Sequence, residues 1–287
     1  MTATISSEAT GRTIDAAGVS THYHEAGSGP PVLLLHGSGP GVSAWANWRL
    51  TMPGLARNYR VIAPDLVGFG YTERPRDVYY SLQTWIDHVW SFLDALGIKQ
   101  TSVVGNSLGG RIALDMAAQR PDRLHRMVLM GAPGIGMTFT DGLKALREYQ
   151  PSEQNMRQLL LSYFAVDPAI ITDDLVRTRH EASVAPGAFE AYRDMFFSPR
   201  HAGSELGITE QQVKSVTTRT LLVHGHQDKV VPVQVAWNML RLLPDAELAV
   251  FDRCGHWTQI ERADDFNDLV ANFLGQAGRA RNSPTGR

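Results

Sequence analysis

Short apolar runs alternate with amphipathic stretches along most of the 287 residues, and this alternation constrains the fold more than any other feature. It is typical of an α/β protein, in which helices cover a mostly parallel sheet. Six runs are predicted as buried or half-buried strands, at residues 32–36, 60–63, 101–106, 127–130, 220–224 and 247–251. Four amphipathic stretches are predicted as helices, at residues 82–96, 108–119, 233–242 and 264–274.

The alternation is interrupted between Gly131 and Thr220. This interval has helical spacing at 141–149, 152–164, 172–183 and 188–197, punctuated by Pro151, Pro168, Pro186 and Pro199. We therefore expect a helical lid at 135–208, inserted between two parts of a core at 12–134 and 209–275, with a flexible tail at 276–287. Helices inserted over a sheet would close a pocket from above.

Composition excludes several classes of partner. The 27 basic and 29 acidic residues give a net charge of -2, which supplies no basic stripe for nucleic acid. The single cysteine, Cys254, cannot form an intrachain disulfide, so we expect a cytoplasmic protein. Residues 1–11 lack the features of a secretory signal, and no apolar stretch reaches membrane-spanning length, so no membrane association is expected.

The pattern Gly105-Asn106-Ser107-Leu108-Gly109 follows a predicted strand and precedes a predicted helix. This is the context of a nucleophile elbow, in which flanking glycines allow a sharp turn that exposes the serine hydroxyl. The alternative interpretation is a serine that caps a helix after a glycine turn. The surrounding strand and helix favour Ser107 as a nucleophile.

A serine hydroxyl needs a neighbouring base, and that base needs a carboxylate to hold its tautomer. Asp228 follows the predicted strand at 220–224, and His256 follows the one that ends at Phe251. Both lie at carboxyl ends of strands, on the same sheet edge as Ser107. The order Ser, Asp, His along the chain is that of the α/β-hydrolase triad.

A third requirement is a pair of backbone amides where negative charge develops on the attacked carbonyl. Leu108 follows the nucleophile and supplies one, and the amide of Ser38 or Gly39 in the glycine-rich loop after the first buried strand is expected to supply the other. His36 is interpreted as a brace for that loop, and Asp65 as a carboxylate that orients a neighbouring loop.

Two His-x-His pairs, His22 with His24 and His224 with His226, could each offer two metal ligands. No third ligand cluster accompanies either pair, so we interpret all four as structural and predict neither a metal nor a cofactor. His226 lies close to Asp228 in the sequence, and its role is left open.

Four segments resemble a known family: HGSGPG at 36–41, WANW at 45–48, GNSLGG at 105–110 and RCGHWTQIE at 253–261. Over nearly its whole length the chain resembles the meta-cleavage product hydrolases of aromatic degradation, which have the α/β-hydrolase fold, and within them most nearly the 2-hydroxymuconate semialdehyde hydrolases. One departure is Leu108, where the family usually has a bulkier or sulfur-containing apolar residue.

The resemblance implies cofactor-independent hydrolysis of a carbon–carbon bond. The substrates would be 2-hydroxy-6-oxohexa-2,4-dienoates, cleaved to 2-hydroxypenta-2,4-dienoate and a carboxylic acid. By the same resemblance Arg179 grips the substrate carboxylate, assisted by Asn47, Asn106 and Trp257, although Arg177 could be the true partner. The resemblance also implies a homo-oligomer, a dimer or larger, and small rather than phenyl substituents on the dienoate.

Other functions remain open at this stage. A carboxylesterase could use the same triad and oxyanion loop, and a non-catalytic receptor of this fold could bind a small ligand under the lid. The aspartate that haloalkane dehalogenases and epoxide hydrolases use as nucleophile is replaced here by Ser107. Steady turnover of a dienoate would exclude the receptor.

Overall fold

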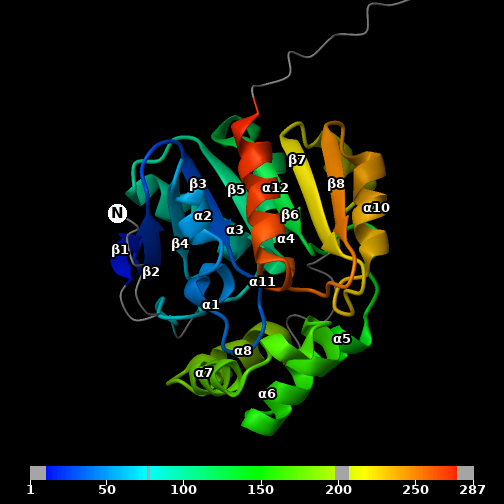
Figure 1. Cartoon of the computed structure of the whole chain (residues 1–287). Coiled ribbons are helices and arrows are strands. Elements are labelled where there is room, and N and C mark those ends of the chain that lie inside the picture. Colours follow the sequence, from blue (N-terminus) through cyan, green and yellow to red (C-terminus); the bar gives the residue numbers. More distant parts are fainter. Residues whose placement is uncertain (1–10, 76–77, 198–206, 277–287) are drawn as a thin grey trace, which may run out of the picture.

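An eight-stranded sheet forms the centre of the molecule in the computed structural model, which describes residues 11–75, 78–197 and 207–276 (Figure 1). The strand order is β1-β2-β4-β3-β5-β6-β7-β8. β1 and β2, and β2 and β4, pair antiparallel, and all other neighbours pair parallel. The strands are β1 Arg12–Ala16, β2 Val19–Ala26, β3 Pro31–Leu35, β4 Arg60–Pro64, β5 Thr101–Asn106, β6 Leu124–Met130, β7 Arg219–Gly225 and β8 Ala246–Phe251.

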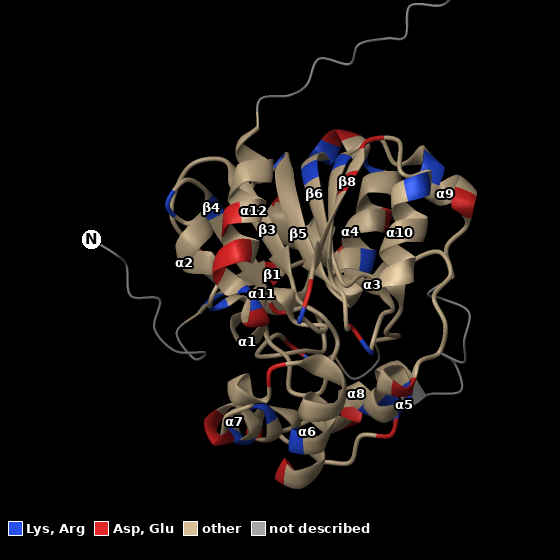
Figure 2. Cartoon of the chain, turned by 45° about the vertical axis from the view of Figure 1, so that its right-hand side comes forward, with Lys and Arg blue, Asp and Glu red and all other residues tan. Residues whose placement is uncertain are grey.

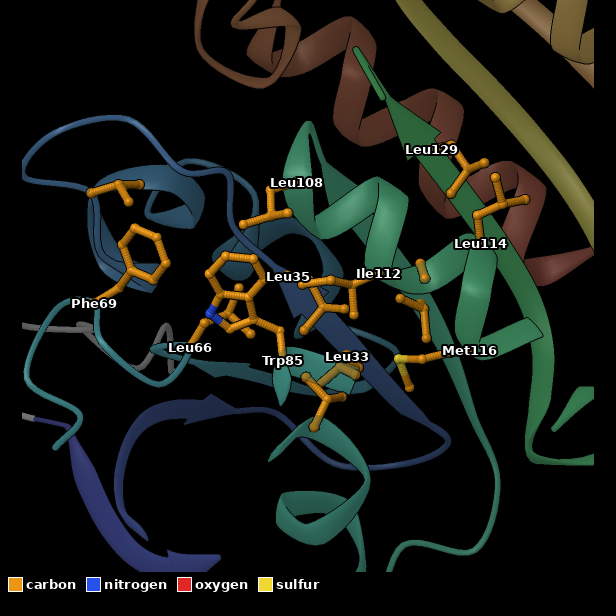
Figure 3. Close-up of a cluster of buried hydrophobic side chains, with 14 of the residues drawn as sticks. Leu33, Leu35, Leu66, Phe69, Trp85, Leu108, Ile112, Leu114, Met116 and Leu129 are labelled. Atoms are coloured by element: carbon orange, nitrogen blue, oxygen red, sulfur yellow. The ribbon is translucent and has the colours of Figure 1, made fainter. Parts of the chain in front are cut away.

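Helices cover both faces of the sheet (Figure 1). Those of the core are α1 Ala44–Trp48, α2 Met52–Leu55, α3 Leu82–Ala95, α4 Leu108–Gln119, α9 Glu210–Ser215, α10 Val233–Leu242, α11 Thr258–Glu261 and α12 Ala263–Gly275. Strand side chains alternate between the two faces, as the pleat requires. Leu33 packs with α3 and α4 on one face (Figure 3), and its neighbour Leu34 packs with α1, α2 and α12 on the other. The sheet is therefore buried on both sides.

A group of helices between β6 and β7 gathers at one end of the sheet (Figure 1). They are α5 Asp141–Arg147, α6 Glu153–Leu159, a π-helical turn at Leu160–Phe164, α7 Asp173–Ser183 and α8 Ala188–Phe197. No strand lies in the described part of this segment, and we call its helices the lid. An inserted helical lid on a mostly parallel sheet is the predicted architecture, which is confirmed.

All six predicted strands and all four predicted core helices are present, with ends shifted by a few residues. The six predicted strands do not include β1 and β2, and the sequence patterns did not reveal the short helices α1, α2, α9 and α11. Helices of four to six residues show too little of the 3.6-residue period to be recognised. The predicted lid boundary near 208 and the predicted tail at 276–287 fall largely outside the described residues, as do residues 1–10, so these boundaries stay predictions.

None of the helices in the described part of the chain combines the length and apolar character that crossing a membrane requires.

Candidate active site

Ser107 lies at the turn between β5 and α4 in a strained conformation, with φ 50° and ψ -116°. Positive φ is costly for any residue with a Cβ, and such strain is characteristic of functional sites. The Ser107 amide donates to the carbonyl of Met130 at 2.8 Å, which fixes the turn. Its hydroxyl makes no capping hydrogen bond to α4, so the alternative of a helix-capping serine is wrong.

Glycine is required beside the elbow. A Cβ on Gly109 would lie 2.2 Å from the carbonyl oxygen of Leu35, and one on Gly105 would lie 2.4 Å from the carbonyl of Gly109. Only glycine allows strand and helix to approach this closely. The turn therefore holds the hydroxyl clear of both elements.

His256 and Asp228 form a buried pair, with Nδ1 of His256 2.7 Å from Oδ2 of Asp228. The other carboxylate oxygen, Oδ1, accepts the amides of Val230 at 2.8 Å and Val231 at 2.9 Å. The His256 amide donates to the carbonyl of Phe164 in the lid at 2.8 Å. Carboxylate and ring are thus each held by the backbone as well as by one another.

Asp228 remains ionised in this environment. Burial alone would raise its pKa, but attraction to His256 and hydrogen bonds from His224 and His256 lower it well below its usual value. His224 Nε2 lies 3.4 Å from the carboxylate and donates to the carbonyl of Val231 at 2.8 Å. An ionised Asp228 accepts the Nδ1 proton of His256, which leaves Nε2 as the base. His256 and Ser107 line the same pocket.

The expected oxyanion loop also faces this pocket. Gly37, Ser38 and Gly39 line it, and Leu108 is the first residue of α4 immediately beyond Ser107. Amides of the first turn of a helix have no partner within the helix, so that of Leu108 can serve a developing negative charge.

His36 braces this loop, as predicted. It is buried, its Nδ1 lies 2.6 Å from the carbonyl of Gly37, and its Nε2 accepts the amide of Leu66 at 3.0 Å. Burial lowers the pKa of His36, which favours the neutral ring with its proton on Nδ1. Because both nitrogens are engaged, His36 is not available as a general base for Ser107.

Asp65 orients two loops. Its buried carboxylate accepts the amide of Ala44 at 2.6 Å and that of Tyr71 at 2.9 Å, and pairs with Nδ1 of His22 at 2.8 Å. Burial would raise the pKa of Asp65, but the hydrogen bond from His22 and the nearby ring of His36 lower it. Asp65 thereby anchors the start of α1, the helix that carries Asn47.

The pocket in front of Ser107 combines these groups with polar side chains. Arg179, buried with 5% exposure, comes from α7 of the lid, and its guanidinium lies 5.6 Å from the ring centre of Trp257. The amide nitrogen of Asn47 is buried and has no hydrogen-bond partner among the described residues. That of Asn106 lies 3.4 Å from the carbonyl of Met130. These groups offer donors for a carboxylate and an enol oxygen.

The lid rests directly on the glycine-rich loop. Gly41 has φ +65°, and a Cβ there would lie 2.1 Å from the carbonyl oxygen of Arg179. A Cβ on Gly39 would lie 3.3 Å from Nη2 of Arg179. The close approach of α7 to this loop therefore brings the guanidinium beside the oxyanion loop.

Arg177, the alternative ligand for the carboxylate, lies on the other side of α7. Its side chain is 50% exposed and pairs with Asp174 and, at 3.3 Å, with Glu181. Figure 2 shows that α7 carries charges of both signs. The hydrogen bonds that Arg177 donates to the two carboxylates raise its pKa. The structure brings Arg179, and not Arg177, to Ser107.

His226 and His24 do not line this pocket. His226 is 61% exposed and lies 3.3 Å from Asp252 on the surface. His24 packs its ring against His22 and Trp45. In the described ranges, no group of three metal-ligating side chains is placed to hold a metal ion.

Three apolar residues that the sequence patterns did not single out also line the pocket: Val42, Leu146 and Phe164. The ring of Phe164 packs against His256 at 5.5 Å and Trp257 at 5.0 Å. Phe164 ends a π-helical turn, a feature frequent at functional sites, but such a turn has no sequence signature that would have revealed it.

Comparisons with known proteins show the family and the fold of the chain. The model of the α/β-hydrolase fold family matches residues 30–263. The chain is 46% identical over 271 residues to the 2-hydroxymuconate semialdehyde hydrolase of Pseudomonas sp. strain CF600, with 94% of this chain and 95% of the relative covered. It is 45% identical over 265 residues to a 2-hydroxy-6-oxo-2,4-heptadienoate hydrolase of Pseudomonas putida, covering 92% and 96%. Among solved structures, a serine-to-alanine variant of the meta-cleavage product hydrolase CumD from Pseudomonas fluorescens IP01, complexed with acetates, matches with a TM-score of 0.90 and 49% identity over 93% of this chain and 98% of that one.

Proposed function

The chain belongs to the meta-cleavage product hydrolases of the α/β-hydrolase fold family, and from this premise we propose that it hydrolyses a carbon–carbon bond in 2-hydroxy-6-oxohexa-2,4-dienoates. One observation carries the proposal. The buried Arg179 and two asparagines, Asn47 and Asn106, line the same pocket as Ser107 and His256. An esterase needs the triad and the oxyanion hole but has no need of a buried guanidinium beside them.

Substrate binding is assigned to Arg179 of the lid together with Asn47 and Asn106 of the core. The guanidinium of Arg179 matches the planar geometry of a carboxylate, which it can bind through two parallel hydrogen bonds. The unpartnered amide of Asn47 and that of Asn106 can bind the neighbouring 2-oxygen. This orientation directs the far carbonyl, carbon 6, towards Ser107.

The first chemical step in this proposal is ketonisation. The proton of the 2-hydroxyl is lost and carbon 5 gains one, giving the 2,6-dioxo acid. We assign the proton relay to His256, whose Nε2 faces the same pocket as Ser107. Ketonisation makes carbon–carbon cleavage possible, because carbon 5 can then leave as a carbanion delocalised over the unsaturated keto acid.

Ser107 then attacks carbon 6 while Nε2 of His256 takes the hydroxyl proton. The amides of Leu108 and of Ser38 or Gly39 would stabilise the oxyanion. On collapse, the electron pair of the bond between carbons 5 and 6 moves into the dienolate, which takes a proton and leaves as 2-hydroxypenta-2,4-dienoate. Water, activated by His256, cleaves the remaining acyl-serine to a carboxylic acid.

Both curated relatives named above have substrates with a small group at carbon 6, a hydrogen in the semialdehyde and a methyl in the heptadienoate. We propose the same preference here. The test mixes purified protein with the yellow ring-fission products of catechol, 3-methylcatechol and 2,3-dihydroxybiphenyl and follows the loss of colour. The first two should be bleached faster than the third.

Hydrolysis of p-nitrophenyl acetate, measured beside the dienoates, separates this proposal from a carboxylesterase. Turnover of the ester without bleaching of any dienoate would exclude the carbon–carbon hydrolase. A variant with His256→Ala that still ketonised the dienoate at the wild-type rate in stopped-flow absorbance would exclude His256 as the proton relay.

We also propose a cytoplasmic location, expected from the single cysteine, and a homo-oligomeric state, implied by the family resemblance. Sedimentation velocity would test the second, and a monomer at micromolar concentration would contradict it.

A further inference from the structure

A second and larger cavity adjoins the candidate active site. Its volume is about 280 Å³, against about 20 Å³ for the pocket in front of Ser107. It lies between the loop 39–43, the loop 68–74 and residues 182–192 of the lid. Gly39 and Val42 line both spaces, so a passage between the two would run past these residues. A substrate that enters between core and lid at this cavity would reach Ser107 through that passage.

Arg74 provides the positive charge of the cavity lining. Its Nη2 donates to the carbonyl of Gly70 at 2.5 Å, whereas its Nε is buried and has no hydrogen-bond partner among the residues that the structure describes. No carboxylate within the described ranges lies within ion-pair distance of its guanidinium. The stem of Arg74 runs below the lid, because a Cβ on Gly187 would lie 3.6 Å from its Cδ.

The environment of Arg74 favours an anion. Arg74 is half-buried, and this burial lowers the pKa of its guanidinium below the ordinary value. Asp65 raises this pKa, but its carboxylate is already engaged by His22 and the amides of Ala44 and Tyr71. A partly buried cation with an unused donor gains more from a carboxylate than a fully solvated one does.

We propose that Arg74 forms a capture site for the carboxylate of the incoming 2-hydroxydienoate, before that carboxylate passes Gly39 to reach Arg179. The inference rests on the proposed function for the identity of the anion. Arg179 lies at the far side of the passage, where its Nη2 would approach a Cβ on Gly39 to 3.3 Å. Two cations therefore flank the route, one in the outer cavity and one beside Ser107.

Such an arrangement acts on the rate of association more than on the chemical step. A positive charge in a cavity with low-dielectric walls attracts an anion and accelerates its encounter with the site, and salt weakens the effect. Arg74 is thus a binding residue of the access route. It does not touch the reacting atoms in this proposal.

The test measures the association of the catechol ring-fission product with protein carrying Ser107→Ala, by stopped-flow absorbance. Arg74→Gln should slow association about tenfold at low ionic strength and about twofold in about 0.5 M salt. Arg74→Lys should retain most of the rate, since it keeps the charge. Arg241→Gln, an exposed arginine on α10, removes the same charge far from the cavity and should behave as the parent. Equal rates for Arg74→Gln and its parent at low salt would overturn the proposal.

A second test of the capture site uses steady-state kinetics of protein that retains Ser107. Arg74→Gln should lower kcat/KM for the dienoate, leave kcat unchanged, and leave hydrolysis of uncharged p-nitrophenyl acetate unchanged. Equal losses with both substrates would show a general disturbance of the site and contradict the capture role. Thermal melting compares the folding of Arg74→Gln and Arg74→Lys.

The proposed reaction and the proposed capture site at Arg74 would be excluded by different results. If the wild type turned over no dienoate while the Ser107→Ala protein still bound it in an Arg74-dependent manner, the capture site would stand and the proposed reaction would fall. Turnover by the wild type with no effect of Arg74→Gln would give the reverse result.

Discussion

The carboxyl edge of the sheet and the lid contribute to the same pocket with different kinds of structure. Ser107, Asp228 and His256 each lie in a tight turn just beyond a strand, held by backbone hydrogen bonds and close glycine contacts. Arg179 and Phe164 instead come from short helices of the lid. The edge of the sheet places the proposed reacting groups, and the lid supplies the arginine proposed to bind the substrate carboxylate. Variants of the two regions should therefore change different kinetic constants.

The largest effect is expected at the edge of the sheet. Ser107→Ala should lower kcat by at least about 10⁴-fold, because it removes the nucleophile and leaves only the oxyanion hole and binding. Both dienoates and p-nitrophenyl acetate should show this loss in absorbance assays. Ser215→Ala, at an exposed position on α9, is the control. A loss confined to one substrate would show that the two reactions use different nucleophiles.

A variant of the lid should affect the dienoate more than the ester, whereas Ser107→Ala should affect both. Arg179→Gln should lower kcat/KM for the dienoate about 10²-fold, as expected for loss of a buried charge-assisted hydrogen bond. The neutral ester should lose less than about threefold, since it has no carboxylate to bind. Arg177→Gln, two residues away and exposed, should change neither rate. Parallel losses for both substrates in Arg179→Gln would remove the distinction between the regions.

Acid should weaken the core through His88 on α3. Burial lowers its pKa to about 4, with a smaller contribution from the charge of His36. Its Nδ1 accepts the amide of Val67 at 3.3 Å, and its Nε2 lies 2.8 Å from Oγ1 of Thr21, so the native ring is neutral. The unfolded chain binds the extra proton near pH 6.5, so this contribution to stability is present above pH 6.5 and is lost as pH falls towards 4.

Between pH 7 and pH 5 the loss from His88 should reach about 2 kcal/mol in the free energy of unfolding. His88→Gln cannot take up that proton, so its urea-unfolding curves should depend less on pH over this window, whatever its stability at pH 7. If the unfolding curves of His88→Gln and of the wild type shifted equally with pH, His88 would not titrate in this way.

The smallest expected effect is on KM, and it comes from removing the N-terminal cap of α7 or of α3. Thr172 caps α7 by accepting the amide of Leu175 at 3.2 Å, and Ser81 caps α3 by accepting that of Thr84 at 3.1 Å. Replacing either by alanine should cost about 1 kcal/mol of local helix stability. Because α7 carries Arg179, Thr172→Ala should raise KM for the dienoate about twofold to threefold through weaker binding, while Ser81→Ala should leave KM unchanged. A higher KM in both variants would contradict the division between lid and core.

The same division explains what the sequence could predict. Ser107, Asp228 and His256 were predictable because parallel strands bring their carboxyl ends to one edge of the sheet, whatever the details of packing. The short polar pattern of the Ser107 turn also has a steric meaning that can be read without neighbours.

Contacts in the lid were less predictable. Residues 177 and 179 lie about 200° apart on a helix, so burial of one arginine implies exposure of the other, but spacing alone cannot say which. Phe164 and Leu146 look like ordinary apolar positions of amphipathic helices until their neighbours are known. The cavity at Arg74 is formed by three segments distant in the sequence, and no local pattern records it.

The contact between the lid and the loop at Gly41 sets a spacing in the active site. With no side chain there, the backbone of α7 comes down onto the loop and sets the distance between the guanidinium of Arg179 and the hydroxyl of Ser107. In the proposed reaction these groups bind opposite ends of the chain to be cut. A side chain at residue 41 would therefore push α7, and with it Arg179, away from Ser107, and would change the spacing between the groups proposed to bind the two ends of the substrate.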